Sequence, residues 1–310
     1  MRKTVLESVY ELAKKDERIF YIGSDLGYGT LQKFKEEMPG RFFMEGINEA
    51  NMIGLAAGLA MEGKIPYVNT ISTFLTRRCF EQIVIDLCLH KANVRLIGNG
   101  GGVVYAPLGP THLAIDDIGI LRTIPNMTIV APADAEEMKR LVPATVDYSG
   151  PIYIRIAKGG DPIVTNDKFR FKIGEAIPMR EGNDGLIVTT GITLKLALDA
   201  AEKLNKDGIE VSILHMHTIK PLDKKTLIEY SSKVPIIISI EEHNMFGGLG
   251  SAVAEVIAEA DFKDKKYFKR IAIPDVFPDG YGSQEELMNK YSITSENLIN
   301  TIKELRKIKV

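Results

Sequence analysis

An almost wholly apolar helix is the feature that most constrains this fold. It lies within residues 42–78, which read FFMEGINEANMIGLAAGLAMEGKIPYVNTISTFLTRR. Asn48 is a preferred residue type at a helix start, so we expect the helix to begin just after it. The run that follows lacks the polar face of a surface helix, so we expect it to be buried on most sides. Gly54 and Gly58, four residues apart, would let another backbone approach closely.

Glu49 would lie in the first turn of this helix. A carboxylate is favoured there by the helix dipole, and this alone is a structural explanation. The alternative is an acid held in an apolar pocket and used for proton transfer. The next predicted strand, 64–68, is followed by Phe74 and a helix through residue 89, so Glu49 and Phe74 would share one edge of a parallel sheet. Ligands bind at that edge of open α/β sheets, and an acid beside an aromatic ring suits a flat heteroaromatic ligand.

Strands and helices alternate along the chain, which indicates α/β architecture with mainly parallel sheets covered on both faces. The predicted strands are 19–22, 64–68, 94–97, 128–130, 151–156, 185–189, 210–214, 235–240 and 270–273. The predicted helices are 2–15, 30–38, one that begins at Glu49, another that ends at residue 89, 115–122, 133–146, 194–206, 224–233, 247–259, 284–291 and 295–307. A linker predicted at 158–171 leaves two three-layer α/β/α domains, 1–160 and 171–310.

Composition argues against several functional classes. A net charge of −2 over 310 residues gives no footprint for nucleic acid, and no apolar run is long enough to span a membrane. Cys79 and Cys88 lie nine residues apart in one predicted helix, too far for a disulfide. With no visible signal peptide, this favours two buried thiols in a reducing cytoplasm.

Two further motifs have a structural interpretation. The glycine-rich segment 98–102 follows a predicted strand but lacks the Lys-Ser/Thr of a P-loop. We interpret it as backbone that bends into an active-site loop. His215 and His217 could ligate a metal, but no third ligand is evident, so we favour a structural role and predict no metal ligand in this chain.

Four motifs, in this order, resemble the transketolase-like enzymes that depend on thiamine diphosphate. Glycine, Ile47 and Glu49 resemble the glutamate motif of their pyrimidine-binding domain. Ser-Thr-Phe-Leu at 72–75, followed by Arg77, is most similar to the 1-deoxyxylulose-5-phosphate synthase branch. Gly-Pro-Thr-His at 109–112 resembles the transketolase loop. Glu-Glu-His at 241–243 and Gly-Gly-Leu-Gly-Ser-Ala at 247–252 resemble the last domain of the family.

The resemblance implies a pyrimidine-binding fold for the first domain, a transketolase C-terminal fold for the second, and roles for the residues that match. Glu49 would bond N1′ of the cofactor's aminopyrimidine and so favour the imino form of the 4′-amino group, which takes up the C2 proton. Phe74 would stack on the pyrimidine. The same matching places Leu26, Ile47 and Ile71 in the lining of the pocket and Arg77 and Asp25 near it.

The resemblance also implies substrate contacts. His112 would contact carbonyl or hydroxyl oxygens of the donor, and Arg155 and Arg2 would bind the distal phosphate of a sugar. Leu108 stands where transketolases usually have an aspartate that reads the C2 hydroxyl, and Gly100 stands about where a phosphate-reading histidine is expected. These departures point to a deoxy sugar, a sulfonated sugar or a substrate without a C2 hydroxyl of the usual hand.

The family's Gly-Asp-Gly motif for diphosphate and Mg²⁺ is missing. We therefore expect the C-terminal half of a split transketolase, active only with a separate N-terminal subunit that holds both groups, in a heterotetramer. It would transfer a two-carbon ketol unit from a ketose or ketose phosphate to an aldose. The alternatives are a decarboxylating enzyme, like 1-deoxyxylulose-5-phosphate synthase or the β chain of a 2-oxoacid dehydrogenase, and a non-catalytic regulatory partner.

Overall fold

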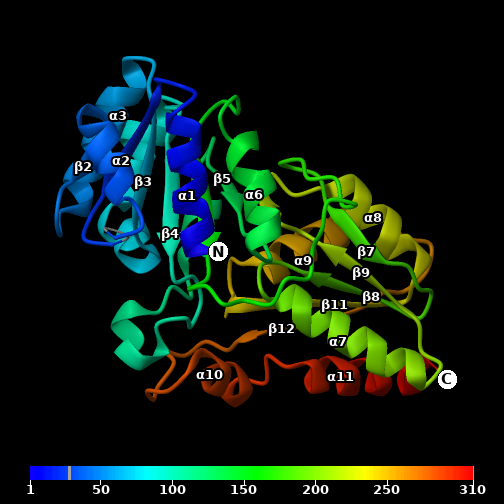
Figure 1. The fold of residues 1–310 in the computed structure, drawn as a ribbon. Coiled ribbons are helices and arrows are strands. Elements are labelled where there is room, and N and C mark those ends of the chain that lie inside the picture. Colours follow the sequence, from blue (N-terminus) through cyan, green and yellow to red (C-terminus); the bar gives the residue numbers. More distant parts are fainter. Residues whose placement is uncertain (27–28, 310) are drawn as a thin grey trace.

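Two sheets covered by helices form the protein (Figure 1). The computed structural model describes residues 1–26 and 29–309. The strands are β1 (Ile19–Gly23), β2 (Phe42–Met44), β3 (Ile65–Ile71), β4 (Arg95–Asn99), β5 (Thr128–Val130), β6 (Ile152–Ile156), β7 (Ile177–Arg180), β8 (Gly185–Thr189), β9 (Val211–His215), β10 (Thr218–Lys220), β11 (Ile236–Asn244) and β12 (Tyr267–Ile273).

Helices of several turns alternate with short helical segments. The α-helices are α1 (Arg2–Ala13), α2 (Gln32–Glu37), α3 (Glu49–Met61), α4 (Phe80–Gln82), α5 (Asp117–Arg122), α6 (Ala135–Ala144), α7 (Thr193–Lys206), α8 (Lys224–Lys233), α9 (Leu249–Glu259), α10 (Gln284–Lys290) and α11 (Ser295–Lys309). The short 3₁₀ or π segments are η1 (Pro39–Arg41), η2 (Phe74–Arg78), η3 (Ile83–Leu89), η4 (Ala106–Leu108) and η5 (Pro110–His112).

The first sheet has the strand order β10-β5-β6-β4-β3-β1-β2. Its neighbours pair in parallel, except for β10, which runs antiparallel to β5. The carboxyl ends of β1, β3 and β4 therefore meet at one edge, as expected for the residues that follow them. The predicted helix that follows Arg78 and runs through residue 89 is present as α4 and η3, and η2 directly precedes it. The turns of η2 and η3 are wide π-helical turns.

The second sheet has the order β12-β11-β8-β9-β7, with only β7 antiparallel to its neighbour. All nine predicted strands are present, and the two mainly parallel sheets confirm the predicted α/β class. Three strands, β2, β7 and β10, were not predicted; each has only three or four residues. Because β10 comes from the second half of the chain yet pairs with β5, the first sheet draws on residues from both sides of the predicted linker.

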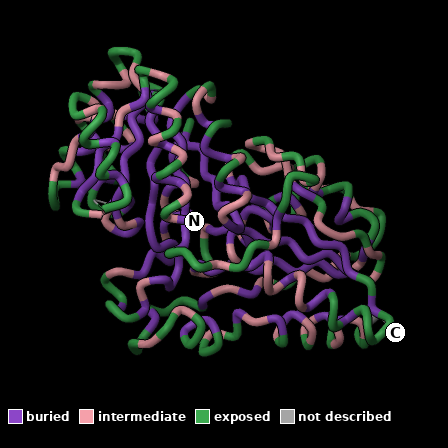
Figure 2. The backbone as a smooth tube through the Cα atoms, in the orientation of Figure 1, coloured by how far each residue is buried: buried purple, intermediate pink, exposed green. Residues whose placement is uncertain are grey.

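Burial follows the strands. Every residue of β4, β6, β8 and β9 is buried, as expected for strands covered by helices on both faces. Figure 2 shows the buried backbone running through the centre of each sheet, with exposed backbone on the outer loops and helices. These four strands therefore end within the core, and the loops that follow them project from it.

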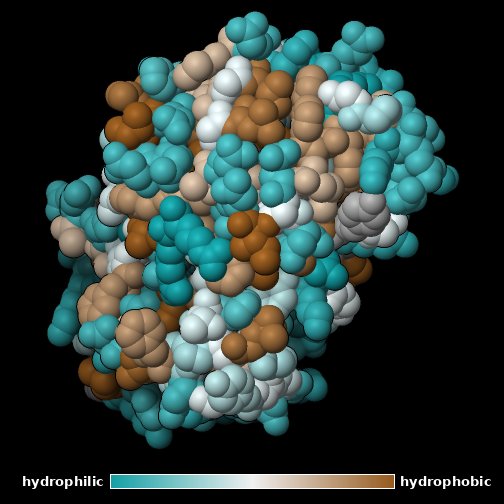
Figure 3. All heavy atoms as spheres, turned by 90° about the vertical axis from the view of Figure 1, so that its left-hand side faces the viewer, coloured by the Kyte–Doolittle hydropathy of each residue, from teal (hydrophilic) through white to brown (hydrophobic). Residues whose placement is uncertain are grey.

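The apolar helix α3 differs from its prediction. Met52, Ile53 and Ala56 are buried against the sheet, but Gly54 and Gly58 are exposed, and an added Cβ there would meet no atom within 4 Å. The prediction of burial on most sides was wrong for this single chain, because no described segment covers the outer face. The side of the molecule where α3 and β2 lie in Figure 1 carries apolar patches among hydrophilic side chains (Figure 3).

Two smaller expectations can be compared with the structure. Cys79 and Cys88 are both buried and free. Among the described residues, none of the helices has the length and apolar character needed to cross a membrane.

Candidate active site

Glu49 lies at the start of α3, where the sequence predicted it. The chain leaves β2, turns at Gly46 with a φ of 69°, and enters α3 directly at Glu49. The N-cap residue Asn48 makes no side-chain cap hydrogen bond. Glu49 is only 4% exposed, so its carboxylate needs a partner within the protein.

That partner is Arg78, which sequence reasoning did not single out. Its Nη1 donates to both carboxylate oxygens of Glu49, at 3.2 and 3.1 Å. The same guanidinium lies over the face of Phe74, with Cζ 4.1 Å from the ring centroid. On Phe74 the His112 ring packs edge to face, with the two centroids 5.1 Å apart. Arg78 thus joins Glu49 to Phe74, and Phe74 in turn contacts His112.

The η2 turn holds Phe74 and Arg78 in this arrangement. Thr76 donates to the carbonyl of Ser72 at 2.8 Å, and Phe74 and Arg78, four residues apart, lie on one face of the turn. The Thr73 hydroxyl donates to the Leu113 carbonyl at 2.9 Å. The loop that carries His112 is thereby fastened to the turn that carries Phe74.

Arg77 is held on the other side of the turn. Its Nε and Nη2 bind both carboxylate oxygens of Asp116, at 2.9 to 3.2 Å, and Nη2 also donates to the Leu113 carbonyl. Arg77 therefore lies near the cluster but makes its own contacts, with Asp116 and Leu113 as its hydrogen-bond acceptors among the described residues.

The other residues expected to line the pocket lie at the same sheet edge. Ile71 ends β3, and Asp25 and Leu26 follow β1, the neighbouring strand. Asp25 accepts a hydrogen bond from Ser24 at 2.9 Å. Ile47 is 75% exposed, and Leu108 also projects into solvent. Both apolar side chains thus lie open beside the cluster.

The glycine-rich loop packs against side chains, which explains its composition. Gly100 has a φ of 75°, and a Cβ there would lie 2.1 Å from the Tyr105 ring. Gly102 has a φ of 70°, and its Cβ would lie 2.3 Å from the carboxyl carbon of Glu242. The tyrosine therefore takes the space of any side chain at position 100. Burial raises the pKa of Tyr105, and the charge and hydrogen bonding of the neighbouring Arg2 side chain act in the opposite direction.

Arg155 is not where a sugar-binding residue should be. β6 is an inner strand, and Arg155 is only 7% exposed. Its Nε donates to Asp117 at 2.8 Å, and its Nη2 donates to the carbonyls of Ala114 and Glu242 at 3.1 and 2.8 Å. The expected binding of a sugar phosphate by Arg155 does not fit this geometry, because its hydrogen bonds serve the contact between the two halves of the chain.

The acidic cluster of β11 also serves that contact. Glu241 accepts from the backbone N–H groups of Leu249 and Gly250 at the start of α9, both at 2.7 Å. Glu242 accepts from the Val103 N–H and from the Gln284 amide, both at 2.8 Å. Burial raises the pKa of Glu242 to about 7, although Arg155 and the two donors favour its charged form. These contacts support the structural interpretation of residues 241–243.

The two histidines at the end of β9 are packed as structural residues. His215 and Glu137 of α6 share a hydrogen bond of 3.0 Å, and both are fully buried. His217 stacks on Phe171 with centroids 4.3 Å apart, and burial lowers its pKa to about 4. Within residues 1–26 and 29–309, no three His, Cys, Asp or Glu side chains are grouped to hold a metal ion.

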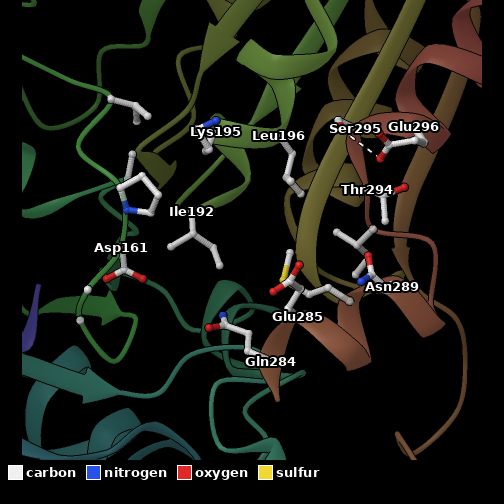
Figure 4. A pocket seen from close by; sticks show the side chains of 17 residues that line it. Asp161, Ile192, Lys195, Leu196, Gln284, Glu285, Asn289, Thr294, Ser295 and Glu296 are labelled. Carbon is white, nitrogen blue, oxygen red and sulfur yellow. Dashed lines mark hydrogen bonds between the residues drawn. The ribbon is translucent and has the colours of Figure 1, made fainter. Parts of the chain in front are cut away.

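A cavity of about 490 Å³ lies well away from the Glu49 cluster. Figure 4 shows it between the linker at Asp161, the α7 residues Lys195 and Leu196, and side chains from α10 and α11. None of the predicted site residues lines it. The residue types and contacts, rather than the cavity volume, identify the candidate active site.

Arg78 and the Arg155 network are the functional and structural features that sequence reasoning missed. A cation four residues after an aromatic residue on a helical turn was a usable signal for Arg78. The pairing of Arg155 with Asp117 had no such signal, because it depends on how α5 packs against β6 and β11.

Comparisons with known proteins identify the family of the two domains. Residues 1–160 match the family model of the transketolase pyrimidine-binding domain, and 174–298 match that of the transketolase C-terminal domain. The chain is 33% identical over 306 residues to the 6-deoxy-6-sulfo-D-fructose transketolase subunit SqwH of Clostridium sp. (strain MSTE9), covering 98% of this chain and 94% of that one.

Two further matches are a full-length enzyme and a solved structure. The chain is 38% identical over 304 residues to 1-deoxy-D-xylulose-5-phosphate synthase of Geobacillus sp. (strain WCH70), covering 96% of this chain but 48% of that protein. A solved structure of a split-gene transketolase, an inactive beta4 tetramer, superimposes with a TM-score of 0.87 at 33% identity, covering 98% and 96% of the two chains. By sequence and fold, this chain belongs to the transketolase family, with its pyrimidine-binding and C-terminal domains.

Proposed function

We propose that the chain is the C-terminal subunit of a two-subunit transketolase, which transfers a two-carbon ketol unit from a ketose or ketose phosphate to an aldose. The observation that carries the proposal is the grouping of Glu49, Phe74 and His112 at the carboxyl edge of the first sheet. A buried acid beside an aromatic face is the environment that a flat, nitrogen-rich ring requires.

Thiamine diphosphate fits these residues. A planar guanidinium already lies between the Phe74 ring and the Glu49 carboxylate, so this space accepts a flat hydrogen-bonding group. Glu49 would hold the ring by a hydrogen bond at N1′ and Phe74 by stacking, with Leu26, Ile47 and Ile71 around it and Asp25 close by. When bound, the cofactor supplies an electron sink for breaking and forming carbon–carbon bonds.

His112 has the position and chemistry to handle substrate. Its ring packs on Phe74 and is partly exposed, and a hydrogen bond of 2.9 Å joins its Nδ1 and the Thr111 hydroxyl. The other ring nitrogen can therefore donate to a carbonyl or hydroxyl oxygen of the donor sugar. His112 would orient the donor and move a proton to or from its oxygen.

A second subunit would complete the site. The chain has no Gly-Asp-Gly motif for the diphosphate and Mg²⁺, so we assign both to a separate N-terminal transketolase subunit. The uncovered face of α3 and the open side chains of Ile47 and Leu108 support a surface that another chain covers. The expected assembly is a heterotetramer of two chains of each kind.

The substrate is expected to differ from that of ordinary transketolases. Leu108 cannot read a hydroxyl, Tyr105 takes the place of a side chain at position 100, and Arg155 is turned inward. Arg2 beside Tyr105 remains as the candidate phosphate or sulfonate contact. A relative acts on a sulfonated deoxy sugar by name, so a donor screen should begin with deoxy and sulfonated ketoses.

A decarboxylating reaction is the second candidate. The Ser-Thr-Phe-Leu segment and the match to 1-deoxy-D-xylulose-5-phosphate synthase favour it. Release of CO₂ from pyruvate by the assembled complex, with no ketol transfer between sugars, would replace the transketolase assignment with this one. A complex in which the Glu49→Ala chain stays fully active would instead favour a regulatory partner.

Calorimetric titration with thiamine diphosphate and Mg²⁺ tests the proposal directly. We expect no tight binding to this chain alone and a saturable isotherm once the N-terminal subunit is added. Tight binding to this chain alone would contradict the split site. Absence of binding to the complex would contradict the proposed function.

A further inference from the structure

Arg78 occupies the space between the two residues that would hold the cofactor ring. Its guanidinium is hydrogen-bonded to Glu49 at 3.1 and 3.2 Å and lies 4.1 Å above the centre of the Phe74 ring. A flat ring that bonds Glu49 while stacking on Phe74 would need the same two contacts. Only one planar group at a time can lie on this face of Phe74 between it and Glu49.

We propose that Arg78 is an internal substitute for the pyrimidine ring: it fills the ring's place in the ligand-free chain and must leave when the ring binds. The inference rests on the proposed function, since it takes thiamine diphosphate as the ligand. Its consequence is that Arg78 lowers the affinity for the cofactor, because the ring competes with a side chain tethered beside the site.

The contacts of the two neighbouring arginines support a movable Arg78. Arg77 is 33% exposed and donates to Asp116 and to the Leu113 carbonyl. Arg78 is 50% exposed, and among the described residues the hydrogen bonds that it makes go to Glu49 alone. A long side chain with one ion-pair partner at the surface can turn into solvent at low cost, whereas Arg77 is tied in place.

The burial of Glu49 explains the role of Arg78 in the ligand-free chain. Glu49 is almost fully buried, and a buried carboxylate without a partner is unfavourable. Arg78 supplies the charge and the hydrogen bonds, and it covers the face of Phe74. The chain can thus remain folded before assembly, with the ring site closed by its own side chain.

Titration of matched variants tests the inference. Thiamine diphosphate with Mg²⁺ is titrated calorimetrically into the complete two-subunit complex carrying wild type, Arg78→Ala or Arg18→Ala. Arg18 is the matched control: it is also 50% exposed and pairs with a carboxylate, Asp16, at 2.7 Å, with Asp147 as a more distant second partner at 3.9 Å, but it precedes β1 at the opposite sheet edge. We expect Arg78→Ala to bind the cofactor about tenfold more tightly than wild type, and Arg18→Ala to bind as wild type does.

A second measurement, thermal unfolding, requires neither the N-terminal subunit nor enzymatic activity. The unfolding temperature of the chain alone should fall in Arg78→Ala, because Glu49 loses its partner, and millimolar methylguanidinium should recover part of that loss. Methylguanidinium should have no such effect on Arg18→Ala. If Arg78→Ala does not fold, Arg78→Lys, which keeps the charge without the plane, takes its place, with a smaller gain in affinity expected.

The outcomes separate the inference from the proposed function. Equal affinity in wild type and Arg78→Ala would overturn the inference and leave the proposed function intact. Weaker binding in Arg78→Ala would also overturn it, because Arg78 would then be a ligand contact. Failure of every complex to bind thiamine diphosphate would overturn the proposed function and the inference with it.

Discussion

Two buried glutamates of this molecule lie in different surroundings: Glu49 at a sheet edge and Glu242 between the two halves of the chain. Glu49 starts α3 at the edge of the first sheet, and its partner Arg78 is half exposed and, among the described residues, donates hydrogen bonds to Glu49 alone. Glu242 lies near the end of β11 between the two halves of the chain, where Val103, Gln284 and the Arg155 network enclose it. One carboxylate has a partner that can leave, and the other is fixed on every side.

The difference between these two glutamates shows that burial of an acid does not by itself identify a catalytic residue. Both residues are nearly inaccessible, and burial raises the pKa of Glu242 to about 7. Yet the contacts of Glu242 go to backbone and side chains that are enclosed in the fold, whereas those of Glu49 go to a half-exposed arginine that lies over the Phe74 ring. A replaceable partner, more than a perturbed acid, marks the candidate catalytic position.

Replacing Glu49 should have the largest effect on activity. Glu49→Gln keeps the size of the side chain but removes the acid, so kcat of the assembled complex should fall by about 10²–10⁴-fold, the usual contribution of a positioned acid or base. The measurement is steady-state ketol transfer at saturating cofactor. The control is Glu45→Gln, at a nearby carboxylate that bonds Asn51, and wild-type kcat in Glu49→Gln would contradict the catalytic role.

Breaking the network around Arg155 should lower the free energy of unfolding more than breaking the ion pair of Glu49 and Arg78. Arg155→Met leaves Asp117 buried without its cation, so the free energy of unfolding should fall by about 3–5 kcal/mol. Arg78→Met removes a half-exposed partner, and the loss should be about 1 kcal/mol. Urea unfolding of the isolated chain measures both, and equal losses would erase the distinction between the two regions.

The pH dependence of stability should come from Glu242. Its pKa of about 7 lies above the ordinary value, so the folded protein holds this proton more tightly than the unfolded chain does. Stability should therefore fall as the pH rises from about 4.5 to 7, by on the order of 3 kcal/mol, and this contribution should level off above pH 7.

Glu242→Gln removes the titrating proton but keeps an oxygen for Val103 and Gln284. Unfolding free energies of wild type and variant at pH 5 and pH 8 test this prediction. We expect the difference between the two pH values to shrink in the variant. An unchanged difference would assign the pH dependence to other groups.

The smallest effect is expected at His112, on the substrate side of the Glu49 cluster. His112→Ala should lower kcat/KM about tenfold through loss of a hydrogen bond to the donor, while stability changes by less than about 0.5 kcal/mol because the ring is partly exposed. Kinetics and thermal unfolding of the same samples provide the two values. A large loss of stability with unchanged kinetics would place His112 in the fold instead.

Much of the fold was predictable because local patterns and tertiary packing agree. β5 and β8 have the predicted bounds, and α8 does as well. The short strands β2, β7 and β10 were not predictable, since three or four residues have too little pattern of their own and pair only because a neighbour is in place. In the candidate site, Glu49, Phe74 and His112 were identified from motifs. The contacts of Arg78 with Glu49 and Phe74 were not predicted.

By itself the sequence determined the alternation of strands and helices, the family and the position of the acid at the start of an apolar helix. These properties depend on the order of residue types within short segments, which a linear pattern records. Only the tertiary structure decided which arginine meets which carboxylate. Arg78 and Arg155 are both arginines in the first domain of the family. The Arg78 side chain lies over Phe74 at the carboxyl edge of the first sheet, whereas Arg155 lies on an inner strand of that sheet. Charge pairing depends on distances across the fold, and residues far apart in the chain acquire those distances only when the sheets and helices pack.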